Sequence, residues 1–159
     1  MAETDFEISA GVSQFAIDVD QKFGTQIEDN STATSYSFAA YRHISNEAAW
    51  GAAIEYTLPL GRDNSLPGSG RLIGFRVINY LGQISEKTSF EAYAGFARYD
   101  WIKTANGYLF GLAYRYDIFG ENTGIMFDAK YYQDLAYDSP QGDDIVDGFN
   151  TSIKLFYRF

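Results

Sequence analysis

The chain has 159 residues and no cysteine, so residues 1–159 are expected to form one domain without disulfides or thiolate chemistry. Its formal net charge of −9 disfavours nucleic acid as a partner. Hydrophobic residues make up 46% of the chain, yet the longest apolar stretch, Ala48 to Ile54, is far shorter than the roughly 20 residues of a membrane-spanning helix. These features exclude a helical membrane protein.

Apolar side chains instead alternate with polar or small ones, which predicts β-strands. Between Ala48 and Leu58, the even positions carry mostly large apolar residues, whereas the odd positions carry Ala, Gly, Glu and Thr. The segments 108–118 and 125–132 alternate in the same way. Eight strands are expected, at residues 5–19, 34–43, 48–58, 71–81, 89–101, 106–117, 124–134 and 149–159.

Two of these strands alternate less regularly. In the first, the apolar residues change parity between Val12 and Phe15, which predicts a bulge near Ser13-Gln14. In the fourth, one parity is expected to face outward (Ile73, Phe75, Val77 and Leu81), which turns Leu72, Ile78 and Tyr80 inward.

Short turns are expected at residues 44–47, 82–88 and 117–124. Longer connections are expected at residues 20–33, 59–70 and 134–148, with a short tip at 103–107. All three prolines (Pro59, Pro67 and Pro140) fall in the longer connections, where no ladder hydrogen bond is lost. Short turns at one end and longer loops at the other are typical of bacterial outer-membrane barrels.

The last strand shows the alternation most clearly. One face carries Phe149, Thr151, Ile153, Leu155, Tyr157 and Phe159, and the other carries Asn150, Ser152, Lys154, Phe156 and Arg158. The aromatic share of 18% suits the aromatic girdles of a membrane barrel. The sequence therefore predicts an all-β fold, an eight-stranded antiparallel up-and-down transmembrane β-barrel with short periplasmic turns and longer extracellular loops. Its first and last strands must pair, because lipid cannot satisfy an open edge.

The inward parity carries charges of both signs in similar number. An unpaired charge away from water is costly, so these residues are expected to form a structural ion-pair network. The alternative is a gated ion path through the same side chains. The predicted network comprises Glu7, Glu55, Arg76, Glu91, Arg115, Asp128, Lys130 and Lys154.

The chain offers little for catalysis. His43 is the single histidine and lies beside the first short turn, where Arg42, Ser45 and Glu47 would complete a triad-like cluster on paper. A lone histidine at a turn is far more often structural, so no catalytic residue, cofactor or metal site is expected.

The last long connection is acidic, with Asp134, Asp138, Asp143, Asp144 and Asp147. The spacing Asp143-Asp144-x-x-Asp147 supplies carboxylates for a hard cation such as Ca²⁺, but the fixed ligand pattern of a calcium loop is missing. A solvated acidic loop is the simpler interpretation. Glu28 and Asp29 are likewise expected in a polar loop.

Three features resemble the outer membrane protein A and X families. These are the turn segments Ala40-Tyr41-Arg42-His43-Ile44-Ser45-Asn46-Glu47 and Ala113-Tyr114-Arg115-Tyr116-Asp117, the ending Leu155-x-Tyr157-x-Phe159, and the hairpin spacing. The resemblance implies that Leu155, Tyr157 and Phe159 are the signal read by the barrel-insertion machinery, although Lys154 stands where the family often has glycine. It also implies a role in envelope integrity, adhesion or defence against host factors.

We therefore expect a non-enzymatic, integral, multi-pass barrel of the bacterial outer membrane, monomeric and with its signal peptide already removed. Its expected partners are outer-membrane lipid and lipopolysaccharide, the insertion machinery and an unidentified surface ligand. The alternatives are, in this order, a narrow channel or small-molecule passage, a lipid A-modifying enzyme and a soluble lipocalin-like barrel.

Overall fold

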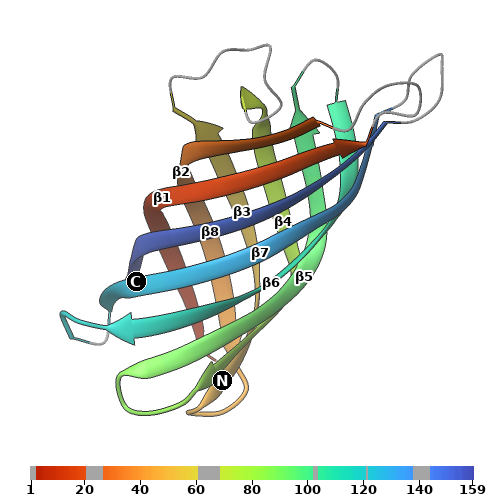
Figure 1. Cartoon of the computed structure of the whole chain (residues 1–159). Coiled ribbons are helices and arrows are strands. Elements are labelled where there is room, and N and C mark those ends of the chain that lie inside the picture. Colours follow the sequence, from red (N-terminus) through yellow and green to blue (C-terminus); the bar gives the residue numbers. More distant parts are fainter. Residues whose placement is uncertain (1–2, 21–26, 61–68, 102–103, 121, 138–143) are drawn as a thin grey trace.

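The computed structural model describes residues 3–20, 27–60, 69–101, 104–120, 122–137 and 144–159. Eight antiparallel strands form one closed barrel, in which each strand pairs with its neighbours in sequence (Figure 1). The strands are β1 (Thr4–Asp20), β2 (Ile27–His43), β3 (Ala48–Pro59), β4 (Arg71–Gln83), β5 (Thr88–Asp100), β6 (Thr104–Asp117), β7 (Thr123–Tyr137) and β8 (Asp144–Arg158). The predicted number and order of strands are confirmed.

The barrel closes by pairing between β1 and β8. This ladder runs from Glu7 opposite Arg158 to Asp20 opposite Ile145 without a shift in register. Both ends of the chain therefore lie at the same end of the barrel (Figure 1). Three short turns, β2–β3, β4–β5 and β6–β7, lie at this end, which we call the short-turn end. The opposite end is called the loop end.

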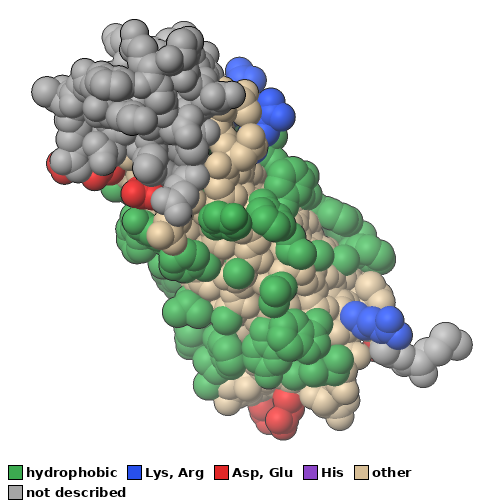
Figure 2. Space-filling model, turned by 90° about the vertical axis from the view of Figure 1, so that its right-hand side faces the viewer, with side chains coloured by type: hydrophobic (Ala, Val, Ile, Leu, Met, Phe, Trp, Pro, Cys, Tyr) green, Lys and Arg blue, Asp and Glu red, His purple; other side chains and the backbone are tan. Residues whose placement is uncertain are grey.

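The alternation of side chains places the apolar set outside. Ile54, Phe110 and Phe127 are 46%, 46% and 50% exposed, whereas their inward neighbours Glu55, Leu109 and Asp128 are 3%, 2% and 3% exposed. Figure 2 shows hydrophobic side chains over the middle of one face and charged side chains towards the two ends. This arrangement is the inverse of a lipocalin, whose apolar face lines the interior. Among the described residues, no helix is long and apolar enough to cross a membrane.

Several strands are longer than predicted. β2 begins at Ile27, so Glu28 and Asp29 lie in a strand rather than in the expected loop 20–33. β7 continues to Tyr137, and β8 begins at Asp144. The extension of β2 carries polar residues on both parities, so it has no apolar period. Pairing with neighbouring strands supplies the order of the extensions instead: Asp18 of β1 lies opposite both Glu28 and Asp147, and Tyr137 of β7 lies opposite Ala105 of β6 and Asp144 of β8.

The bulge predicted near Ser13-Gln14 does not form. β1 pairs with β2 and with β8 without a register shift, and its parity continues unbroken. Phe15 and Ile17 point into the interior, where each is 2% exposed. The change of apolar parity therefore reflects an apolar region inside the barrel rather than a slip of the strand.

A bulge occurs in β4 instead. The pairing of β4 with β5 shifts between Arg76 and Ile78, and as a result Val77 and Ile78 both face outward, with 55% and 59% exposure. The parity reverses beyond this point, so Leu81 is buried and Tyr80 packs outside against Trp50 at 5.2 Å between ring centroids. The predicted orientation of Ile78, Tyr80 and Leu81 was wrong for this reason.

Gly11 lies at the seam between β1 and β8, where the two main chains approach closely. A Cβ at this position would collide with the main-chain oxygen of Ile153. We expect Gly11→Val to lower the free energy of unfolding by about 1–3 kcal/mol, measured by urea titration in detergent micelles. Ala10→Val, one residue away on the outward face, is the matched control and should change stability little. Equal stability of the two variants would contradict the close approach.

Candidate functional site: the charged interior

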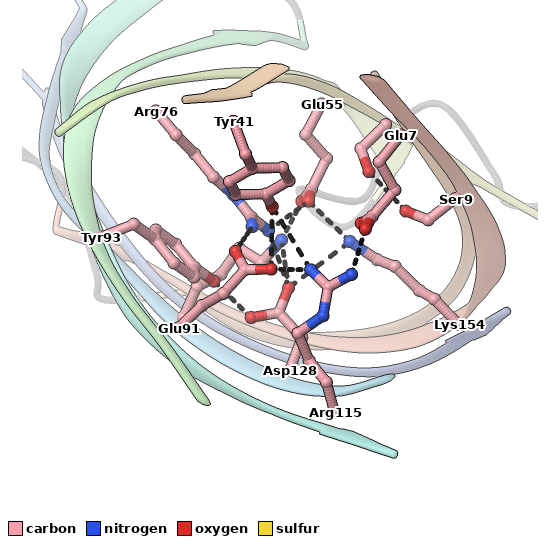
Figure 3. A network of polar contacts seen from close by, with 12 residues as sticks. Glu7, Ser9, Tyr41, Glu55, Arg76, Glu91, Tyr93, Arg115, Asp128 and Lys154 are labelled. Carbon is pink, nitrogen blue, oxygen red and sulfur yellow. Dashed lines mark hydrogen bonds and ion pairs between the residues drawn. The ribbon is translucent and has the colours of Figure 1, made fainter. Parts of the chain in front are cut away.

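All eight predicted interior charges point into the barrel, where each is at most 4% exposed. We call these eight side chains the interior network. They come from seven different strands and converge near the middle of the barrel (Figure 3). Four are acidic and four are basic, so the network is formally neutral. A neutral set is what a closed interior requires, because an unbalanced buried charge is costly.

Two carboxylates hold three cations on one side of the network. Glu55 accepts hydrogen bonds from Arg76 Nη2 at 2.8 Å and Lys154 Nζ at 2.6 Å, and it also pairs with Lys130. Asp128 lies 3.1 Å from Arg76 Nη2, 2.9 Å from Lys130 Nζ and 3.4 Å from Lys154 Nζ. Each cation is therefore shared between two acids from different strands. Removing either acid leaves cations without their full complement of partners.

Arg115 organises the other side. Its guanidinium pairs with Glu7 and Glu91, and its carbon Cζ lies 4.2 Å from the centroid of the Phe156 ring. Arg76 Nη1 donates to the second oxygen of Glu91 at 3.2 Å, which joins the two halves of the network. The result is one continuous set of ion pairs rather than separate bridges.

Two tyrosines complete the network, and neither was predicted from the sequence. Tyr41 donates from its hydroxyl to Glu91 Oε1 at 2.8 Å, and it supplies the contribution of β2. Tyr93 donates to Asp128, and its ring lies 3.8 Å below the Arg76 guanidinium carbon. Their inward parity was visible in the sequence, but an inward tyrosine is not by itself a sign of a charged partner. All eight strands thus join in one polar cluster.

An apolar cluster fills the interior between the network and the loop end. Phe15 contacts Tyr99 and Tyr132 edge to face, with ring centroids 6.4 and 5.9 Å apart. The cluster comprises Phe15, Ile17, Leu72, Tyr93, Ala97, Tyr99, Ala105, Leu109 and Tyr132. The sequence predicted an inward face that mixes small residues with charges, with Leu72 also turned inward, but no separate apolar cluster. The described interior therefore holds an apolar cluster towards the loop end in addition to the charged network.

The triad-like cluster that the sequence allows on paper around His43 is not assembled. His43 Nε2 lies 2.7 Å from an oxygen of Asp5, while the Ser45 hydroxyl accepts a hydrogen bond from the Glu47 main-chain N–H at 3.2 Å. Within the described part of the chain, no group of three or more His, Cys, Asp or Glu side chains is arranged to hold a metal ion. The acidic segment is not the single loop that was predicted, because Asp134 lies in β7 and Asp144 and Asp147 lie in β8. Asp138 and Asp143 lie outside the described residues, so cation binding by Asp143-Asp144-x-x-Asp147 is untested.

The three residues of the expected insertion signal, Leu155, Tyr157 and Phe159, face outward on β8 and are 60%, 48% and 60% exposed. Phe159 closes the seam between β1 and β8. Its main-chain N–H donates to the main-chain oxygen of Phe6 at 2.9 Å, and its main-chain oxygen accepts from the N–H of Phe6 at 3.0 Å. The Phe6 ring lies 6.2 Å from that of Phe159. The C-terminal residues thus form the last pairs of the barrel.

The two Tyr-Arg segments that carried the resemblance are out of phase. Tyr41 points inward and Arg42 outward, whereas Tyr114 points outward and Arg115 inward. The same Tyr-Arg dipeptide therefore has opposite orientations in the two strands. Only one residue of each pair enters the interior network.

Comparison with known proteins supports the fold. No protein-family model and no curated protein sequence matches the chain. Among solved structures, OprG of Pseudomonas aeruginosa is 10% identical with a TM-score of 0.60 and covers 99% of this chain and 97% of its own. Neisserial surface protein A is 11% identical with a TM-score of 0.59 and 97% coverage of both chains. Ail of Yersinia pestis is 13% identical with a TM-score of 0.56 and 99% coverage of both, and was solved with the heparin analogue sucrose octasulfate. The chain thus has the fold of small outer-membrane barrels.

Proposed function

We propose that this protein is a non-enzymatic, integral barrel of the bacterial outer membrane, with a sealed interior that makes it a structural wall element rather than a channel. The main observation in support of this proposal is that the outer wall is apolar while the interior network is neutral and ion-paired. Lipid favours the first, and in the second each of the eight charges has a partner of opposite sign. The short-turn end then faces the periplasm and the loop end faces the outside, as in other bacterial barrels.

The loop end is the surface for contact with other molecules. Asp18 of β1 lies opposite both Glu28 of β2 and Asp147 of β8, so the loop end is acidic on the side formed by β8, β1 and β2. The polyanion bound to Ail is therefore a poor match here. A cationic surface partner fits the charge, since complementary potentials steer association.

The membrane part of the proposal is tested by electrophoretic mobility after refolding from urea. The expected result is a compact, fast-migrating band that shifts on boiling and forms only when detergent micelles or vesicles are present. The circular dichroism spectrum of the same samples should be that of a β-sheet protein. A monomeric, folded protein obtained in plain buffer would contradict the membrane barrel.

The sealed interior is tested by conductance in planar bilayers. We expect no stable open state with the wild-type protein, because the network and the apolar cluster occupy the interior. The positive control is an open barrel of known conductance, which verifies that the bilayer can report single channels. Steady single-channel currents that change in the Glu55→Gln variant would instead establish the narrow channel that is the alternative function.

A further inference from the structure

A groove of about 640 Å³ lies in the outward wall, where β6, β7, β8 and β1 run side by side. Its sides are large apolar side chains, among them Leu112, Phe127 and Ile153, which are 65%, 50% and 52% exposed. Between them the small outward residues Ala129 and Thr151 lie opposite each other on β7 and β8. In a membrane this hollow must contain hydrocarbon, because it offers water few polar partners.

One edge of the groove is polar. Thr151 of β8, Gln14 of β1 and Thr32 of β2 stand in one register row, and Gln14 Nε2 donates to Thr32 Oγ1 at 2.8 Å. The carbonyl oxygen of Gln14 has no hydrogen-bond partner among the described residues. An amide facing hydrocarbon without a partner costs free energy, so this row calls for a polar group from outside the chain.

The row lies at a defined depth. Thr151 precedes Phe159 by eight residues, which corresponds to about 26 Å along the strand. A strand tilt of roughly 40° reduces this to about 20 Å of height, within an apolar band about 25 Å tall. The polar row therefore lies near the outer edge of the apolar band, in the outer leaflet. The apolar sides at Val12 and Ile153 lie one step deeper.

We propose that this groove binds one acyl chain of a lipid A molecule in the outer leaflet, with the linkage at the head of that chain hydrogen-bonded to Gln14. The proposal rests on the membrane orientation given above. Lipid A chains carry amide linkages and hydroxyl groups, which both donate and accept, as the Gln14 amide and the threonine hydroxyls do. The row holds no charged side chain, so it suits this neutral linkage rather than a phosphate.

The test uses the refolded full-length protein in detergent micelles, with either purified lipid A or dipalmitoyl phosphatidylglycerol, and native mass spectrometry as the readout. Wild type should retain one lipid A under activation that removes phosphatidylglycerol. Ala129→Phe, which fills the groove, and Gln14→Leu, which removes the amide, should each lower the retained fraction about tenfold. Ala52→Phe places the same ring at a small outward position of β3 and should leave retention unchanged.

Three results would overturn the inference: equal retention of both lipids, unchanged retention in Ala129→Phe, or a protein dimer that disappears in Ala129→Phe. The last would assign the groove to a second copy of the chain. Each variant is first checked for the mobility shift on boiling. Absence of that shift in the wild type contradicts the proposed function, whereas a folded wild type that fails to retain lipid A contradicts the groove alone.

Discussion

Replacement of Glu55 by leucine is expected to lower the free energy of unfolding by about 3–5 kcal/mol, because it leaves three buried cations short of a partner. Glu55 accepts hydrogen bonds from Arg76 and Lys154 at 2.8 and 2.6 Å and pairs with Lys130. Leucine fills a similar volume, so the loss reports on charge rather than on a cavity. Urea unfolding in detergent micelles, followed by the fluorescence of Trp50 and Trp101, measures the change.

Thr57→Val is the matched control for Glu55→Leu. Thr57 is the next inward residue on β3 and is 2% exposed, and its hydroxyl makes only neutral hydrogen bonds, with Ser35 at 3.2 Å and with Tyr132. Its loss should cost about 1 kcal/mol. The double variant Glu55→Leu/Lys154→Met should recover part of the stability, because it removes one of the stranded cations. If Glu55→Leu lowers the free energy of unfolding no more than Thr57→Val does, the ion-pair network is not the main source of stability in the interior.

Ile54→Arg, at the neighbouring outward position, should lower the stability in lipid vesicles by about 2–4 kcal/mol. Ile54 is 46% exposed and lies near the middle of the outward face of β3, between Trp50 and Leu58. An arginine there would place its charge in hydrocarbon. Reversible unfolding by guanidinium in vesicles, compared with Ile54→Leu, measures the cost.

The inward neighbour gives a second contrast for Ile54→Arg. Ala53 lies opposite Arg76 and packs against Ala39, Tyr41, Ala49 and Leu81. Ala53→Arg should therefore prevent folding in both vesicles and detergent, through crowding and an added positive charge. A neutral Ile54→Arg in lipid would mean that the outward wall of β3 does not face hydrocarbon.

The regular strands could be derived from the sequence because side-chain direction alternates residue by residue along a strand. In β3, β6, β7 and β8 this period separates a large apolar set from a small or charged set, so both the strand and its outward face follow. Closure by β1 and β8 followed from the requirement that a membrane barrel has no open edge. The inward position of the eight charges followed from the same parity.

The alternation failed where both faces carry similar residues. β4 is apolar on both parities, and only its pairing with β3 and β5 reveals the bulge after Arg76. Phe15 and Ile17 imitate a change of register because the interior near the loop end is itself apolar. The polar extension of β2 at Glu28 and Asp29 has no period at all, and it is ordered by pairing with β1.

The sequence by itself determined the eight strands, their closure and a charged interior, because these depend on a local period and on the needs of lipid. Tertiary structure alone decided which charges meet. Arg115 pairs with Glu7 across 108 positions of sequence, and Arg76 reaches Asp128 across 52. Such partners depend on the stagger of strands around the closed barrel, which brings side chains from opposite walls to the same height. The outer groove likewise exists only where four neighbouring strands set large residues around small ones.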